Sequence, residues 1–216
     1  MTSDEPLDGP VNLDAARLAG VRAAALDELR RRPKPVSWRR EAVGTMAIVL
    51  GTTALVIGAG AWLSIVEIEK VRERIVPLIL LVVLQALGVF AAIAPGRAAL
   101  RWTLGVLALA AAVAMLMGRG EGVVPGTPAL ACSTSHVAVD LIPLGLALFA
   151  LRRFSWTLGR SLLAGVAAAA TGAIAGELSC GRGWSHALFH HIGAGLVIAL
   201  VCVVFSRARR PHTYAS

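Results

Sequence analysis

The sequence predicts an all-α polytopic membrane protein with six transmembrane helices and a short cytoplasmic N-terminal helix. Hydrophobic residues make up 56% of the chain, and its mean hydropathy is +0.72. Its 22 glycines accompany long runs of Ala, Leu and Val, which is typical of spanning helices rather than of a soluble core. Six stretches approach the roughly 20 apolar residues that cross a bilayer.

Residues 1–41 are predicted to form a cytoplasmic N-terminal segment. The first ten residues are acidic and contain prolines, a composition typical of disorder, and this acidic start predicts that no signal peptide precedes the first span. A helix is expected over 13–32, because Asn12 can cap its start and Pro33 ends it.

The predicted N-terminal helix carries an apolar stripe but is too small to form its own core. The stripe recurs at helical spacing and consists of Leu18, Val21, Ala25 and Leu29. Two interpretations follow: a helix lying on the inner leaflet beside its own arginines, or a docking helix that presents the stripe to a cytoplasmic protein. In the second case, the membrane tether would let binding sequester that partner.

The transmembrane domain is expected over residues 42–206, followed by a basic cytoplasmic tail, 207–216. The predicted spans are 42–66, 77–94, 102–118, 136–151, 161–178 and 187–205. The fourth is the shortest and contains Asp140 and Pro143. Small residues such as Gly172 and Gly176 are expected to let helix backbones approach closely.

The distribution of basic residues predicts the orientation. Six spans place both termini on one side, and all but five of the 21 Lys and Arg residues fall on that side. The five exceptions are Lys70, Arg72, Arg74, Arg119 and Arg182. The positive-inside rule therefore predicts cytoplasmic termini. No direct nucleic-acid binding is expected, because the basic residues follow the loops and carry no interleaved aromatics.

Two polar clusters at the heads of the fourth and sixth spans form one candidate site if they face the same side. The first contains Cys132, Ser133, Ser135, His136 and Asp140; the second contains Glu177, Cys180, His186, His190 and His191. Cys132, His136 and Asp140 are spaced i, i+4 and i+8, on one face if the helix extends back to Cys132. An ionisable residue inside a span is costly and usually has a partner.

These clusters allow a structural interpretation and three functional ones. Cys132 and Cys180 could form a structural disulfide beside interfacial histidines, or serve as a redox-sensing or metal-responsive pair. Zinc or another metal could bind at the Cys/His cluster, with His136, His186 and His190 as candidate ligands and Asp140 or Glu177 as supporting partner or general base. Histidines on facing helices could instead ligate a haem.

The chain resembles the NrsF and CarR type of membrane anti-sigma factors. The resemblance lies in the order of a cytoplasmic helix and six spans, in Ala131-Cys132-Ser133 and Leu178-Ser179-Cys180-Gly181, and in the stretch 140–165. It implies a non-enzymatic protein that requires no cofactor. Such a protein holds an extracytoplasmic-function (ECF) sigma factor at the bacterial inner membrane and releases it on an envelope, metal or light-linked oxidative stress.

By position, the resemblance implies that residues 12–32 bind the sigma factor and that Cys132 and Cys180 are the paired outer cysteines. The zinc motif of soluble zinc anti-sigma domains is absent, since residues 1–41 contain neither His nor Cys. The alternative function is a membrane zinc hydrolase similar to alkaline ceramidases, from the spacing of His186 and His190 together with Ser133, His136 and Asp140; that family has seven spans. A small transporter or haem membrane protein is a further alternative.

Overall fold

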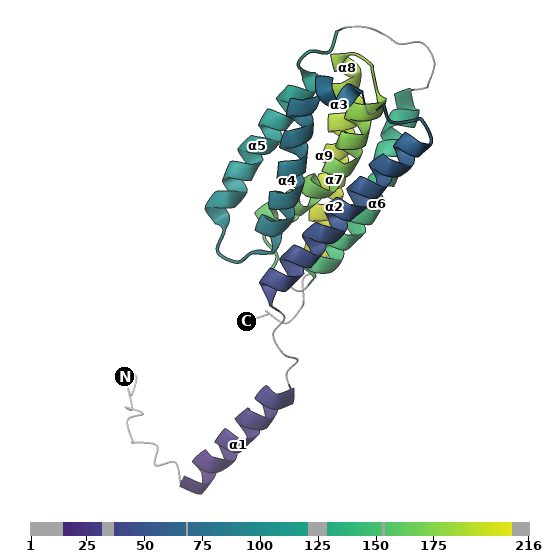
Figure 1. The fold of residues 1–216 in the computed structure, drawn as a ribbon. Coiled ribbons are helices and arrows are strands. Elements are labelled where there is room, and N and C mark those ends of the chain that lie inside the picture. The colour runs from purple at the N-terminus through teal and green to yellow at the C-terminus, as the bar shows by residue number, and fades with distance from the viewer. Residues whose placement is uncertain (1–14, 32–36, 68, 121–128, 153, 209–216) are drawn as a thin grey trace, which may run out of the picture. The chain divides into compact units, whose positions relative to one another are not determined.

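The computed structural model describes residues 15–31, 37–67, 69–120, 129–152 and 154–208, and Figure 1 shows its fold. The chain divides into two units, Met1–Val36 and Ser37–Ser216. The described residues of the first form one helix, and those of the second form a helical bundle.

The N-terminal unit contains α1, Ala15–Arg31, within the range predicted from the sequence. On this helix, Leu18, Val21 and Ala25 of the predicted stripe are exposed. The side chain of Leu29 lies outside the described part of the chain. Asn12, the predicted cap, and the tail beyond Ala208 also lie outside it.

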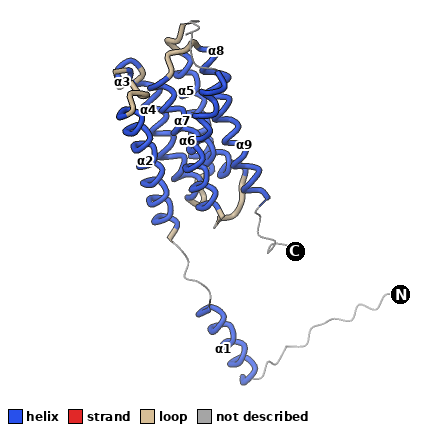
Figure 2. The backbone as a smooth tube through the Cα atoms, turned by 90° about the vertical axis from the view of Figure 1, so that its right-hand side faces the viewer, coloured by secondary structure: helices blue, strands red, loops and turns tan. Residues whose placement is uncertain are grey.

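The bundle confirms the predicted fold class, since six helices are long and apolar enough to cross a membrane. They are α2 Trp38–Trp62, α4 Ile75–Ile93, α5 Ala98–Leu116, α6 Ala129–Leu151, α7 Leu158–Ser179, and a last span built from α8 Trp184–His186, η1 Ala187–Ile192 and α9 Gly193–Ala208. The short helix α3, Lys70–Glu73, follows α2. All described secondary structure is helical (Figure 2).

Helix α7 forms the core of the bundle. Within its apolar window 83% of the residues are buried, against 17% in α2 and in α5, which therefore lie on the outside. The Ala and Gly residues of α7 let α4, α6 and α9 pack against it on different sides. Side chains attached to α7 are consequently placed in the middle of the protein.

The start of α6 differs from the prediction. The helix begins at Ala129 rather than at 136, so that Cys132 lies inside it. Hydroxyl groups in this first part of the helix hydrogen-bond to its backbone. Thr134 Oγ1 donates to the Leu130 carbonyl at 3.0 Å, and Ser135 Oγ donates to the Cys132 carbonyl at 3.0 Å. These hydrogen bonds allow a stretch whose low hydropathy predicts a loop to form part of a helix.

The two ends of the bundle differ in charge. The end holding Trp38 and Ala208, called here the basic end, carries Arg39, Arg40, Arg97, Arg101, Arg152, Arg160 and Arg207 among the described residues. The opposite end, called the mouth, carries α3, α8 and basic residues interspersed with Glu67, Glu69, Glu73 and Glu177. At the basic end, Arg101 and Arg160 donate to the Ala94 carbonyl at 3.4 and 3.5 Å, which stabilises the negative end of the α4 dipole.

A buried polar triad joins three helices halfway along the bundle. Gln85 on α4 donates to Thr53 Oγ1 on α2 at 2.9 Å and to Thr171 Oγ1 on α7 at 2.8 Å. The two hydroxyls lie 2.9 Å apart, and all three side chains are buried. Because no water competes for these groups within a bilayer, the triad fixes the register of α2 and α4 on α7.

We predict that Gln85→Leu lowers the free energy of unfolding by about 1–2 kcal/mol, since it leaves both hydroxyls without their shared donor. The control is Val82→Leu, at an exposed position of the same helix, which should leave stability unchanged. Unfolding of the full chain in mixed micelles under increasing SDS measures both variants. Equal stability of Gln85→Leu and wild type would contradict the assigned role of the triad.

Candidate functional site

The structure brings the two polar clusters together at the mouth. The start of α6 and the turn between α7 and α8 lie at the same end of the bundle. One ligand atom each from Cys132, Cys180 and His186 lies within 4.8 Å of the other two. Both cysteines are half-buried free thiols, so they are close enough for a small change in geometry to join them through a disulfide or a shared soft metal ion.

The other predicted metal ligands divide between two depths. His190 remains at the mouth, where its Nδ1 lies 2.8 Å from Ser133 Oγ and its ring 4.6 Å from the His186 ring. His136 lies deeper and is buried, beside His191 at a ring-centroid separation of 5.7 Å. The predicted set of His136, His186 and His190 is thus not one cluster: two members lie at the mouth and one in the core.

A π-helical turn determines which histidines meet. Residues 187–192 form η1, in which the wider i→i+5 turn brings residues four and five positions apart onto one side. His186 therefore faces both His190 and His191, the latter at 5.4 Å between ring centroids. The sequence pattern did not select His191, because a spacing of 3.6 residues per turn pairs His186 with His190 alone.

Asp140 has the partners that its position inside a span demands. It is fully buried, accepts the backbone N–H of Gly172 at 2.7 Å, and lies 3.0 Å from His136 Nε2. The second contact is close but is not an aligned hydrogen bond, since His136 Nε2 donates instead to the Ala169 carbonyl at 3.3 Å. Asp140 thus orients an imidazole in the core.

Two glycines of α7 provide the space for the buried imidazoles. A Cβ atom on Gly172 would overlap the His136 ring, and one on Gly176 would overlap the His191 ring. The sequence predicts close helix packing at these glycines, and the close contacts there are made by histidine side chains. At Gly165, by contrast, two helix backbones do approach closely: a Cβ there would meet the α9 backbone at Ala199.

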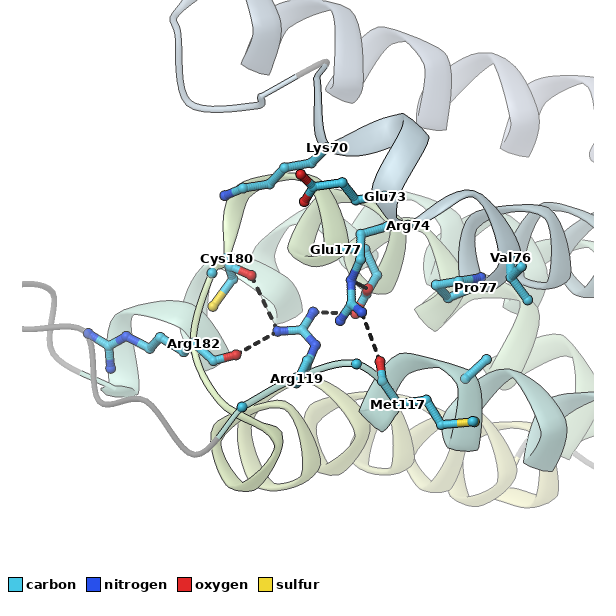
Figure 3. Close-up of a pocket in the computed structure, with 14 residues that line it drawn as sticks. Lys70, Glu73, Arg74, Val76, Pro77, Met117, Arg119, Glu177, Cys180 and Arg182 are labelled. Atoms are coloured by element: carbon cyan, nitrogen blue, oxygen red, sulfur yellow. Dashed lines mark hydrogen bonds and ion pairs between the residues drawn. The ribbon is translucent and has the colours of Figure 1, made fainter.

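A buried ion triad closes the mouth (Figure 3). Glu177, at the end of α7, pairs with Arg74 Nε at 2.8 Å through Oε2 and with Arg119 through Oε1; its side chain is 0% exposed. Arg74 also donates to the carbonyls of Met115 and Met117. Removing one partner from such a group leaves an uncompensated buried charge, which costs about 3–5 kcal/mol.

Arg119 connects this triad to the cysteine turn. Its Nε donates to the Met115 carbonyl at 2.8 Å, and its Nη1 donates to the carbonyls of Cys180 and Arg182 at 3.3 and 2.9 Å. The backbone that carries Cys180 is therefore held by a side chain from the segment that follows α5. The sequence places Arg74 and Arg119 only in outer connections; the acidic residue at the end of a span, Glu177, was the signal that such cations would be needed.

Two cavities adjoin these groups. One, of about 530 Å³, lies against the ion triad and is lined also by Lys70, Glu73 and Arg182. The other, of about 810 Å³, extends from Cys132 and Cys180 past Gly172 and Gly176 to His136 and His191. The second cavity links the mouth to the core imidazoles.

Comparison with known proteins identifies the family. The chain is 37% identical over 204 residues to the carotenogenesis protein CarR of Myxococcus xanthus, a match that covers 94% of this chain and 92% of that protein. The chain belongs to the CarR family. The resemblance stated from the sequence is thereby confirmed at the level of the family. No family model matches the chain, and no solved structure does.

The match to CarR extends over nearly the whole chain, so it reaches into the N-terminal unit as well as the bundle. This CarR-family member consists of a helix with an exposed apolar stripe and a six-span membrane bundle. The mouth and the two buried imidazoles contain more polar groups than the packing of the helices requires.

We predict that Gly172→Ala destabilises the protein by about 1–3 kcal/mol, because the added methyl group displaces the His136 imidazole. The matched control is Gly51→Ala in α2, where a Cβ would meet nothing within 4 Å; it should be neutral or stabilise by about 0.4–1 kcal/mol, as Ala is the better helix former. Unfolding in mixed micelles measures the difference. Equal effects of the two substitutions would rule out the imidazole-filled notch.

Proposed function

We propose that this protein is a membrane-bound anti-sigma factor that sequesters an ECF sigma factor at the bacterial inner membrane and releases it on a stress or light signal. The observation that carries this proposal is the 37% identity over 94% of the chain to a carotenogenesis protein, with the family role inferred from the resemblance above. A function in regulating carotenoid synthesis follows from the name of that relative.

The N-terminal unit supplies the partner-binding element of the proposal. Leu18 and Val21 expose 52% and 69% of their surface on α1, and an exposed apolar stripe of this kind suits docking into a groove of a partner protein. Residues 1–41 are assigned to the cytoplasm, where a sigma factor is found. Tethering to the bundle then keeps the captured protein at the membrane and away from RNA polymerase.

The orientation of the bundle supports the same assignment. The basic end carries arginines from α2, the α4–α5 turn, α6, α7 and α9, whereas the cations of the mouth are balanced by carboxylates. The positive-inside rule places the basic end, and with it both termini, in the cytoplasm. The mouth with Cys132 and Cys180 then faces the periplasm, where oxidants and soft metals reach it first.

The cysteine pair is proposed as the sensing element. The thiol sulfur atoms of Cys132 and Cys180 lie within 4.8 Å of each other, and Arg119 anchors the Cys180 carbonyl to the ion triad. In the proposed mechanism, an external oxidant joins the two thiols and shifts the Cys180 turn relative to α6. Because Arg119 links this turn to Glu177, the shift reaches the end of the core helix. The anti-sigma role requires no catalytic residue and no cofactor.

We predict that the full-length protein, purified in detergent from membranes of its native organism, recovers one ECF sigma factor, identified by mass spectrometry. Combined Leu18→Glu and Val21→Glu substitutions should reduce the recovered sigma factor at least tenfold, because they place charges on the docking stripe. Ala23→Glu, on the opposite face of α1, is the matched control and should retain capture. Recovery without any sigma factor would refute the proposed function, and unchanged capture by the stripe variant would refute the docking helix.

We also predict that mild oxidation of intact cells links Cys132 to Cys180, because their thiols are adjacent at the mouth. A membrane-impermeant maleimide should label both thiols before oxidation and neither afterwards. Cys202→Ser, which removes the fully buried cysteine of α9, should leave this pattern unchanged. If both thiols stay reduced under oxidant and resist the maleimide from outside, the periplasmic redox pair is wrong.

A further inference from the structure

The two core histidines, His136 and His191, have surroundings that helix packing alone does not explain. They are 3% and 4% exposed, and each occupies a notch made by a glycine of α7. Yet His136 Nδ1 and both ring nitrogens of His191 have no hydrogen-bond partner among the described residues. An unpaired polar atom in a protein core is costly, so three such nitrogens on two neighbouring rings indicate a ligand.

The tautomer of His136 is set by its neighbours. Nε2 faces the Ala169 carbonyl and the Asp140 carboxylate, both of which only accept, so Nε2 carries the proton. With the Nε2 proton alone on the ring, the buried Nδ1 offers a lone pair. A histidine whose other nitrogen donates toward a carboxylate or carbonyl is the usual arrangement of a metal ligand, because the second contact fixes the ring and raises its basicity.

The spacing of the two rings suits a shared ion. With metal–nitrogen bonds of about 2.0–2.1 Å, two imidazoles on one tetrahedral ion place their ring centroids roughly 5 to 5.5 Å apart. The His136 and His191 centroids lie 5.7 Å apart, so a small adjustment of either ring completes the geometry. The 810 Å³ cavity that reaches both rings leaves the remaining coordination positions accessible from the mouth.

The chemistry of the donors selects the class of ion. Two imidazoles favour a borderline transition metal such as zinc or cobalt, whereas Ca²⁺ and Mg²⁺ require mainly oxygen ligands. The Asp140 carboxylate beside His136 offsets part of the positive charge that such an ion brings into the bilayer.

We propose that His136 and His191 bind a transition-metal ion in the core of the bundle, with Asp140 as the residue that orients His136. This site is separate from the cysteines of the mouth and uses His191 in place of His190, whose Nδ1 already contacts Ser133. Metal binding here does not require sigma-factor capture, so either proposal can fail without the other.

The test is metal binding by the chelator-treated full-length protein in detergent, titrated with Co²⁺ and then Zn²⁺ and followed by visible absorption and elemental analysis. His136→Ala and His191→Ala should each weaken binding at the core site at least 100-fold, and Asp140→Asn should weaken it about 10- to 100-fold. His190→Ala, from the same π-helical turn, is the matched control and should bind as wild type does. A combined Cys132→Ser and Cys180→Ser variant should also retain the core ion.

A measurement that uses no histidine variant guards against variants that fail to fold. X-ray absorption of the zinc-loaded cysteine-to-serine variant should show only nitrogen and oxygen neighbours at about 2.0 Å. Loss of all binding in this folded variant would assign the ion to the mouth and overturn the proposal. Wild-type affinity in folded His136→Ala or His191→Ala would overturn it equally.

Discussion

Glu177 is the group on which the arrangement of the mouth depends. A carboxylate at the end of the most buried helix must be compensated within the protein. Arg74 reaches it from the segment that leads into α4, and Arg119 reaches it from the segment that follows α5. The same two arginines bind the carbonyls at the end of α5 and in the turn of Cys180. One buried negative charge therefore holds α4, α5, α7 and the cysteine turn in a single arrangement. A shift in any one of them changes the ion pairs and hydrogen bonds made by the others.

Helix α7 extends this arrangement from the mouth into the core. Immediately before Glu177 lies Gly176, which receives His191, and about one turn further back lies Gly172, which receives His136 and donates to Asp140. Next to Gly172 is Thr171, a member of the triad with Thr53 and Gln85. Successive turns of one helix thus connect the cysteine turn, two imidazoles and a hydrogen-bonded triad, so a disturbance at the mouth has a continuous structural path into the bundle.

The sequence was sufficient for the features that depend on composition, and insufficient for those that depend on local geometry. Long apolar runs predicted the six spans, which the structure confirms, and the spacing of Cys132, His136 and Asp140 predicted one helical face, which α6 provides. Hydropathy misplaced the start of α6, because Thr134 and Ser135 bond to their own backbone. The π-helical turn that brings His191 to the other histidines has no simple sequence signature. The pairing of Arg119 with Glu177 could not be predicted either, because the sequence does not show which loop lies across the mouth.

In the proposed function, this membrane protein restrains one sigma factor and responds to signals at the end that carries the mouth. The most direct test of that claim is transcriptome sequencing of a strain lacking this protein, compared with the same strain complemented by the wild-type chain. The account predicts that deletion activates one small set of promoters without any inducing stress, that complementation silences them, and that removing the sigma factor as well abolishes their activity. Unchanged transcription in the unstressed deletion strain would contradict the account.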